Sequence, residues 1–201
     1  MAPLVHEYDP PDRFVAGTVG EPGQRTFFLQ ARSGSRLTSV ALEKQQVAAL
    51  ADRIDELLDE VMSSDAVDVV VPAVAPRDLE DAEPLDQPIE EEFRAGTMTL
   101  SWDPDDARVV IEVFPVVEVT LDPEIAASGP EELGEALAAL EEPEPDEVLL
   151  VRLTAGAARA FVKRAEQVVG AGRPDCPFCG VPIDPSGHLC VRANGFKRRD
   201  P

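Results

Sequence analysis

The hydrophobic positions of this chain first fall into short stretches that are broken by turn residues. Residues 13–19, 25–32 and 36–42 are three such stretches. Glycine, proline and serine separate them at 20–23 and 33–35, where glycine allows a positive φ and proline presets a turn. Three short strands joined by tight turns predict an antiparallel meander.

A helical stripe follows the third stretch. Apolar residues recur at steps of three and four over about 43–62, while most of the acidic residues fall on the other side. A single apolar face of this length predicts an amphipathic helix that packs on the sheet. The stripe consists of Val47, Leu50, Ile54, Leu57, Leu58 and Val61.

A similar order of elements is predicted in the second half of the chain. Residues 90–102 and 107–121 have the pattern of a hairpin around the turn 103–106. Pro115 places the second of these strands at an edge or at a bulge, because proline cannot donate to a ladder. An apolar run over 148–153 predicts a further strand.

A second helix is predicted from Thr154 to about Val169. The Thr154 hydroxyl suits an N-cap, because it can accept a hydrogen bond from a free backbone N–H of the first turn. Gly170 and Gly172 favour the left-handed conformations that end helices, and Pro174 prevents continuation.

Three segments have the composition of loops. Residues 1–11 are rich in proline and predict an extended lead-in. Residues 76–88 combine proline with Asp and Glu, and a segment with so little to bury predicts a mobile loop. The apolar run 68–72 before it could add a strand. The acidic stretch 122–146 predicts a short helix at 131–140 and a linker.

Two five-residue runs suggest an internal repeat. Residues 14–18 read Phe-Val-Ala-Gly-Thr and residues 93–97 read Phe-Arg-Ala-Gly-Thr, and each run precedes two more predicted strands and a helix. We therefore predict an α+β fold of two β-β-β-α repeats with antiparallel sheets, one packed helix each and a pseudo-twofold axis. The two sheets would either join or pack face to face. Chance similarity of short motifs is the alternative. The repeats would span about 13–62 and 90–169 within a duplicated domain of residues 1–170.

Charge is spread unevenly over the chain. The formal net charge is −21, and residues 1–150 hold 35 of the 39 Asp and Glu residues but 9 of the 18 Lys and Arg residues. Residues 151–201 carry the other 9 basic residues against 4 acidic ones, a net charge of +5. The acidic body repels phosphate backbones, which argues against broad nucleic-acid binding. The basic part can contact an anionic partner or simply balance the acidic body.

The sequence predicts a cytoplasmic protein that does not enter a membrane. No stretch approaches the roughly 20 apolar residues that span a bilayer, and residues 1–11 lack the basic-then-apolar pattern of a signal peptide. Three crowded cysteines suit metal binding in a reducing compartment better than a disulfide framework.

All three cysteines and one of the two histidines lie within residues 176–190. Cys176 and Cys179 can face one ion when the chain turns tightly and directs backbone N–H groups at the sulfur atoms. Residues 184–187 can then reverse the chain, so that His188 and Cys190 share one face of the returning strand. These four residues predict a tetrahedral Cys₃His site for Zn²⁺.

The predicted zinc is structural, because four protein ligands leave no open position for water. It would contribute folding energy to a zinc-knuckle module with a basic tail over residues 173–201. Redox chemistry of Cys176 and Cys179 is a weaker alternative, since no thioredoxin-like βαβ pattern surrounds them. Iron–sulfur binding is weaker still.

The C-terminal motif also carries a resemblance. Cys176-Pro-Phe-Cys179-Gly180 resembles the knuckle of rubredoxins and zinc ribbons. Together with the later Asp-Pro-x-Gly-His-x-Cys, Asn-Gly and basic residues, it is similar to the C-terminus of an uncharacterised actinobacterial family that is known only as a domain of unknown function. The Phe-x-Ala-Gly-Thr start after a Pro-rich lead-in is similar too. The resemblance implies a bacterial cytosolic origin and no established activity.

Two other groups of residues are poorer candidates for a site. His6, Glu7 and Tyr8 have the residue types of a catalytic cluster, but they lie in a Pro-rich terminus. Asp103, Asp105 and Asp106 have the residue types of a cation site, but a solvated hairpin turn explains them and no EF-hand spacing occurs. The chain has no Ser/His/Asp pattern and no phosphate loop. An enzyme with a cleft between the repeats stays open as a third hypothesis.

We expect a non-enzymatic zinc-binding protein that acts as an adaptor or regulatory module for another protein. The alternative is binding of nucleic acid or of a transcription complex through the basic tail, which the net charge disfavours. The residues expected to contact an anionic partner are Arg192, Asn194, Phe196, Lys197, Arg198 and Arg199.

Overall fold

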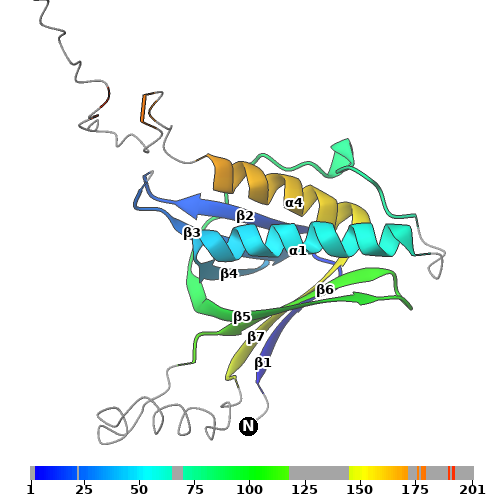
Figure 1. The fold of residues 1–201 in the computed structure, drawn as a ribbon. Coiled ribbons are helices and arrows are strands. Elements are labelled where there is room, and N and C mark those ends of the chain that lie inside the picture. The colour runs from blue at the N-terminus through cyan, green and yellow to red at the C-terminus, as the bar shows by residue number, and fades with distance from the viewer. Residues whose placement is uncertain are drawn as a thin grey trace, which may run out of the picture.

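The computed structural model describes residues 3–21, 23–64, 70–117 and 145–171, and five single residues of the C-terminal segment: Cys176, Phe178, Cys179, Cys190 and Arg192. Seven strands, two long helices and one 3-10 turn make up these ranges (Figure 1). They are β1 (Leu4–Tyr8), β2 (Arg13–Val19), β3 (Thr26–Ser33), β4 (Arg36–Leu42), α1 (Lys44–Ser63), η1 (Arg77–Leu79), β5 (Glu91–Asp103), β6 (Arg108–Pro115), β7 (Glu147–Thr154) and α4 (Ala155–Gly170).

The strands form one sheet in the order β1-β7-β6-β5-β4-β3-β2. Neighbours are antiparallel from β2 to β4 and from β5 to β7. The pairs β4–β5 and β1–β7 are parallel. Parallel neighbours need a long crossover, and α1 with the segment after it supplies the one from β4 to β5.

The predicted α+β class is confirmed, and of the two arrangements expected for the antiparallel groups the structure has the joined one, a single mixed sheet. The crossover through α1 returns the chain in the same direction as β4, so β5 pairs beside β4 and joins both groups of strands in one ladder. The order of three strands and a helix occurs twice in the chain. A duplication behind that order stays a prediction.

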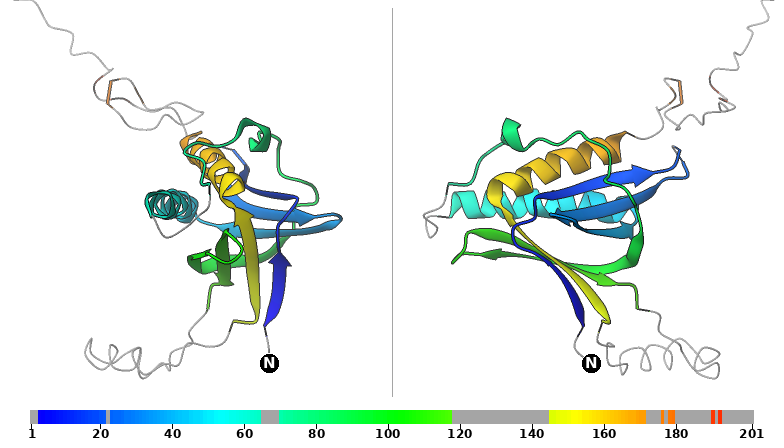
Figure 2. Two further views of the ribbon diagram at one scale, coloured as in Figure 1. Left: turned by 90° about the vertical axis from the view of Figure 1, so that its right-hand side faces the viewer. Right: turned by 180° about the vertical axis from the view of Figure 1, so that it is seen from behind.

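Both helices lie on one face of the sheet and contact each other (Figure 1). The sheet is strongly twisted, so that β1 and β7 run across the direction of β2 and β3 (Figure 2). The main hydrophobic core fills the space between the helices and this face. Its largest fully buried members include Tyr8, Leu29, Ile54, Leu58, Ile111, Leu149 and Phe161.

Strands β2 to β4 are buried on both faces. Phe27 and Leu29 of β3 face the helices, whereas Phe28 between them lies in a second, smaller cluster on the outer face. Residues 80–89, which we call the strap, cover this outer face with Leu85. A Cβ added at Gly17 of β2 would lie 2.5 Å from the Leu85 side chain, so only glycine lets the strap approach this closely.

Most of the strap lies in residues 76–88, for which a mobile loop was predicted because the segment has little to bury, and this premise was wrong. Leu85 is buried, and Gln30 of β3 exchanges two hydrogen bonds with the backbone of Asp86 at 2.7 and 3.1 Å. The composition is acidic because the strap is held by arginines, not because it has nothing to bury.

The N-terminal segment also differs from its prediction, because residues 4–8 form an edge strand. Tyr8 is buried and donates a hydrogen bond to the Thr38 hydroxyl at 2.8 Å, and the Arg36 guanidinium stacks over its ring. The pairing of β1 with β7 supplies the backbone partners that the local sequence lacks.

Several smaller predictions can also be compared with the structure. Thr154 caps α4 by accepting from the Ala157 N–H at 3.2 Å, and the β5–β6 register shifts near Pro115, which confirms the cap and the bulge. The strand expected over 107–121 ends at Pro115. Residues 70–72 form no strand, and the helix expected at 131–140 lies outside the described residues. Within the described ranges, no helix is long and apolar enough to cross a membrane.

Candidate metal centre

The C-terminal segment starts from a fixed point at the end of α4. The helix ends at Gly170, and the Ala171 N–H donates to the Gln167 carbonyl at 2.8 Å. Arg25 donates to the Ala171 carbonyl at 2.7 Å. A cation at a helix C-terminus satisfies free carbonyls and complements the helix dipole.

Cys176 and Cys179 flank a tight turn that includes Phe178. Cys176 is buried, and the backbone N–H groups of Phe178 and Cys179 donate to its sulfur. Burial raises the pKa of the Cys176 thiol, but these N–H groups and the neighbouring thiols of Cys179 and Cys190 outweigh it, so the pKa lies below its ordinary value. The predicted arrangement of N–H groups aimed at sulfur is therefore present for Cys176.

Cys190 brings a third sulfur to the same place. All three Sγ atoms lie within 4.8 Å of one another, and the Cys176 and Cys190 sulfurs are 3.7 Å apart. A disulfide would need about 2.05 Å. Two thiolates bound to one tetrahedral zinc at about 2.3 Å lie roughly 3.8 Å apart, which the observed separation matches.

The other predicted residues of this region stand as follows. His188, the expected fourth ligand, lies outside the described residues, as do Asn194, Phe196, Lys197, Arg198 and Arg199. Arg192 is exposed and donates to the Phe178 carbonyl at 3.3 Å, which ties the chain after Cys190 to the turn between Cys176 and Cys179. Phe178 is 61% exposed. The three sulfurs can thus hold a thiophilic metal ion beside an exposed aromatic ring and a cation.

The carboxylates of the 103–106 turn are engaged by an arginine. Arg152 of β7 donates to Asp103 at 2.6 Å and to Asp106 at 2.9 Å, and also pairs with Asp9. The hydrogen bond from Arg152, followed by the Asp106 N–H, lowers the pKa of Asp103 below its ordinary value. These contacts favour the structural interpretation of the turn over a cation site.

A buried ion cluster was missed by the sequence interpretation. Arg13 of β2 and Arg164 of α4, each 9% exposed at the side chain, both bind Asp81 of the strap, at 2.6 Å in each case. The two guanidinium groups also donate to strap carbonyls at Glu83, and Arg164 donates to Ala16 at 2.8 Å. The only local sequence signal for this cluster was the acidic composition of the strap, and composition alone does not show which basic residues pair with it.

This cluster borders a cavity of about 270 Å³ between β2, α4 and the strap. The stacked rings of Phe14 and Phe161 line its apolar side. Three of its charged groups, Arg13, Asp81 and Arg164, are occupied in holding the strap. The fourth, Asp12, accepts a hydrogen bond from the Gly34 N–H at 2.7 Å. The cavity therefore gives little support to a catalytic cleft.

Comparison with known proteins supplies a family and no activity. No curated protein and no solved structure was found to match the chain. A family described as "Protein of unknown function (DUF3090)" matches residues 6–190, from β1 to the last cysteine of the cluster. Because the match spans nearly the whole fold and the sulfur cluster, the chain belongs to the DUF3090 family.

Proposed function

We propose that the C-terminal segment is a zinc module in which Cys176, Cys179, Cys190 and His188 hold one structural Zn²⁺. The observation that carries the proposal is the convergence of three sulfurs at a spacing that fits zinc. Each thiolate needs positive charge nearby, and zinc supplies it together with a fixed geometry. His188 enters because it is the second residue before Cys190, where an extended backbone would place it on the same side.

Metal content of the purified full chain tests this proposal. After a chelating resin has removed weakly held ions, elemental analysis should find one zinc per chain. Cys179→Ser and His188→Ala should each lose it, whereas His6→Ala, which removes the other histidine, should keep it. Full zinc in His188→Ala would show that another group supplies the fourth ligand. No zinc together with three reactive thiols would refute the module.

The zinc module, we propose further, is the part of this cytoplasmic protein that docks onto another protein. The support is the exposed Phe178 ring, which sits on the turn between two cysteines with the exposed Arg192 hydrogen-bonded to its carbonyl. An aromatic anchor beside an arginine has the composition of an interface centre. The basic residues of the tail extend this surface toward an acidic partner.

Quantitative affinity purification from the source lysate tests the docking role. A partner bound by the wild-type chain should be lost with Phe178→Ala and with Cys179→Ser, because the zinc fixes the turn that presents the ring. Val74→Ala removes an apolar side chain that is 75% exposed elsewhere on the protein and should leave the partner bound. Equal recovery with all four chains would refute a docking role for this surface.

Nucleic acid is the second candidate partner, because an exposed ring beside a cation also suits base stacking. Binding of a single-stranded RNA should then fall steeply with salt and depend on Phe178 and Arg192. The acidic body opposes such binding, which is why a protein partner is the first proposal. Salt-dependent RNA binding that requires Phe178 and Arg192 would favour a nucleic-acid partner, and its absence would favour a protein partner.

The two groups of strands and their helices, we also propose, descend from one duplicated unit. The supporting observation is that Gly17 of β2 and Gly96 of β5 occupy the same place in the two Phe-x-Ala-Gly-Thr runs. A Cβ at either position would meet a neighbour below 3 Å. Also, α4 contacts β2 and α1 contacts β5, so each helix packs on the first strand of the other unit. A chain with the two units in exchanged order should still fold cooperatively if they are equivalent.

A further inference from the structure

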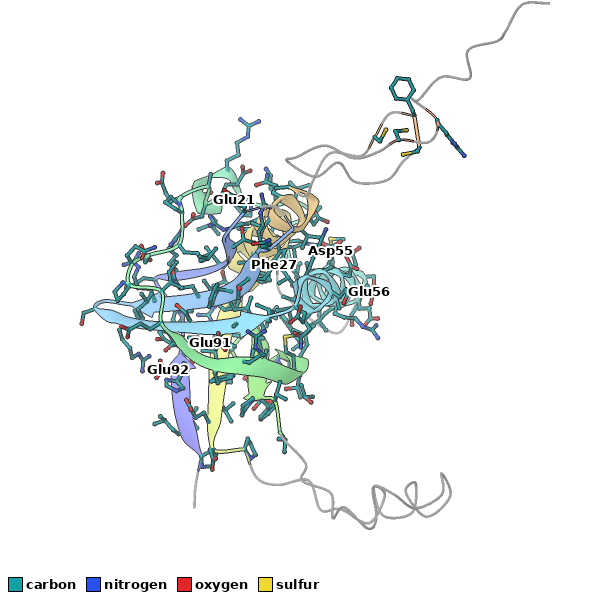
Figure 3. The ribbon with its side chains drawn as sticks, turned by 90° about the vertical axis from the view of Figure 1, so that its left-hand side faces the viewer. Glu21, Phe27, Asp55, Glu56, Glu91 and Glu92 are labelled. Carbon is teal, nitrogen blue, oxygen red and sulfur yellow. The ribbon has the colours of Figure 1, made fainter. Side chains whose placement is uncertain are left out.

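His6, Glu92 and Glu147 come together from three strands that are far apart in the sequence. The His6 Nε2 and a Glu147 carboxylate oxygen are 3.1 Å apart, and the Glu92 carboxylate joins them so that all three ligand atoms lie within 4.8 Å of one another. Figure 3 shows Glu92 at the start of β5, beside β1. We propose that these three side chains bind a first-row divalent cation at a site separate from the cysteine cluster.

The sheet itself positions the three side chains. Leu4 of β1 pairs with Glu147, and His6 pairs with Leu149, so the parallel β1–β7 ladder sets His6 beside Glu147. The β4–β5 pairing fixes the start of β5 through Ser39 and Glu91. Ligands on paired strands are held in place before the ion binds, which lowers the ordering cost of binding.

The charge of the cluster favours a cation. Glu92 and Glu147 bring two carboxylates together in the acidic part of the chain. Within the described residues, Glu147 forms an ion pair with His6 alone, and Glu92 forms no ion pair. The nearest arginine in sequence, Arg94, pairs with Glu43 and Glu91 instead. A divalent ion would neutralise both carboxylates at once.

The ligand set also defines the class of ion. One imidazole nitrogen and two carboxylate oxygens suit Mn²⁺, Fe²⁺ or Zn²⁺, whereas the thiolates of the C-terminal segment select softer ions. Three protein ligands leave coordination positions for water, on the side where Glu92 is exposed. The chain would therefore combine a closed sulfur site with an open nitrogen and oxygen site. The open site is the one that can accept an oxygen ligand.

Mn²⁺ alone is the probe, because the thiolate site does not compete for it. Titration of the full-length protein, followed by the electron paramagnetic resonance of free Mn²⁺, should give one saturable site. Glu92→Gln should weaken it by at least about tenfold. Glu90→Gln is the matched control, since it removes one exposed negative charge two positions away and leaves the cluster intact. Equal affinity in both variants, or no saturable binding at millimolar Mn²⁺, would overturn the proposal.

A spectroscopic measurement identifies the nitrogen ligand directly. The electron spin echo of bound Mn²⁺ should be modulated by an imidazole ¹⁴N. The modulation should vanish in His6→Ala and persist in His188→Ala, the matched histidine control. Circular dichroism checks that His6→Ala keeps the fold. If it does not, the Mn²⁺ titration of Glu92→Gln, a change at an exposed position, still tests the site. Persistence of the modulation in folded His6→Ala would refute the site.

Discussion

At the scale of single residues, Asp81 is the group on which most buried charge depends. It neutralises two arginines from elements far apart in the sequence and lies on a segment without a strand or a long helix. A buried arginine that loses its carboxylate keeps its desolvation cost and loses the attraction that offset it. Arg13 retains a second contact to Asp86 at 3.1 Å, so the loss is partial.

Replacement of Asp81 by asparagine should lower the free energy of unfolding by about 3 kcal/mol. Asp78→Asn, at an exposed position three residues earlier, should change it by less than about 0.5 kcal/mol. Urea denaturation at pH 7 measures both. Similar values for the two variants would mean that the strap contributes little to stability.

The same carboxylate predicts a pH dependence. The hydrogen bond from Arg13, followed by the charges of Arg13 and Arg164, lowers the pKa of Asp81 below its ordinary value of 3.8, although burial opposes the shift. A lowered pKa in the folded state adds stability that is present above the ordinary value and is lost as pH falls through the folded value. Between pH 5 and pH 3 the wild type should therefore lose more stability than Asp81→Asn. Parallel curves would contradict this assignment.

At the scale of elements, the contact of the strap with β2 depends on Gly17 and Leu85. A Cβ at position 17 would overlap the middle of the Leu85 side chain, at 2.5 Å from Cγ, so either the strap or the strand must shift. Gly17→Ala should cost about 1–3 kcal/mol, in the range of overpacked cores.

A double-mutant cycle measures this contact. Leu85→Ala alone should destabilise the protein by about 2 kcal/mol, because it empties a buried position. It should also remove the overlap, so Gly17→Ala in the Leu85→Ala background should cost little. Additive losses in thermal or urea unfolding would show that the alanine methyl group meets something other than Leu85.

The elements that the sequence predicted are those whose signal is local. Period-two and helical patterns indicated the strands β2 to β7 and both helices, and Thr154 marked the start of α4. β1 was missed because its backbone partners are 143 positions away, as for Leu4 and Glu147. The strap was missed for the same reason. The turn around Cys176 was predictable because its donors are the next few residues, whereas the His6 cluster requires knowledge of the sheet order.

At the scale of the whole molecule, the hydrophobic core and the cysteine cluster are separate in the described part of the chain. The buried core runs from Tyr8 to Ala165, with Val168 and Val169 packed against it, and it includes neither Cys176 nor Cys190. The cluster therefore has its own source of stability, which we propose to be zinc.

Loss of that zinc should leave the rest of the protein folded. Cys179→Ser should shift the thermal midpoint followed by far-ultraviolet circular dichroism by less than about 2 °C, as for a change remote from the core. The Asp81→Asn variant, which disrupts the core side of α4, serves as the comparison with a large shift. A large shift with Cys179→Ser would mean that the C-terminal segment packs into the fold.

The parallel pairing of β1 with β7 also has a consequence for synthesis on the ribosome. β1 is made before its ladder partner, which spans Glu147–Thr154 and follows the other six strands and α1 in the sequence. The strands β2 to β4 and α1 can form early from local contacts, whereas β1 must wait unpaired. Contacts between distant segments slow folding because a long loop must close first. We therefore expect β1 to join the sheet late, and a nascent chain that stops before β7 to leave β1 exposed to proteases and chaperones.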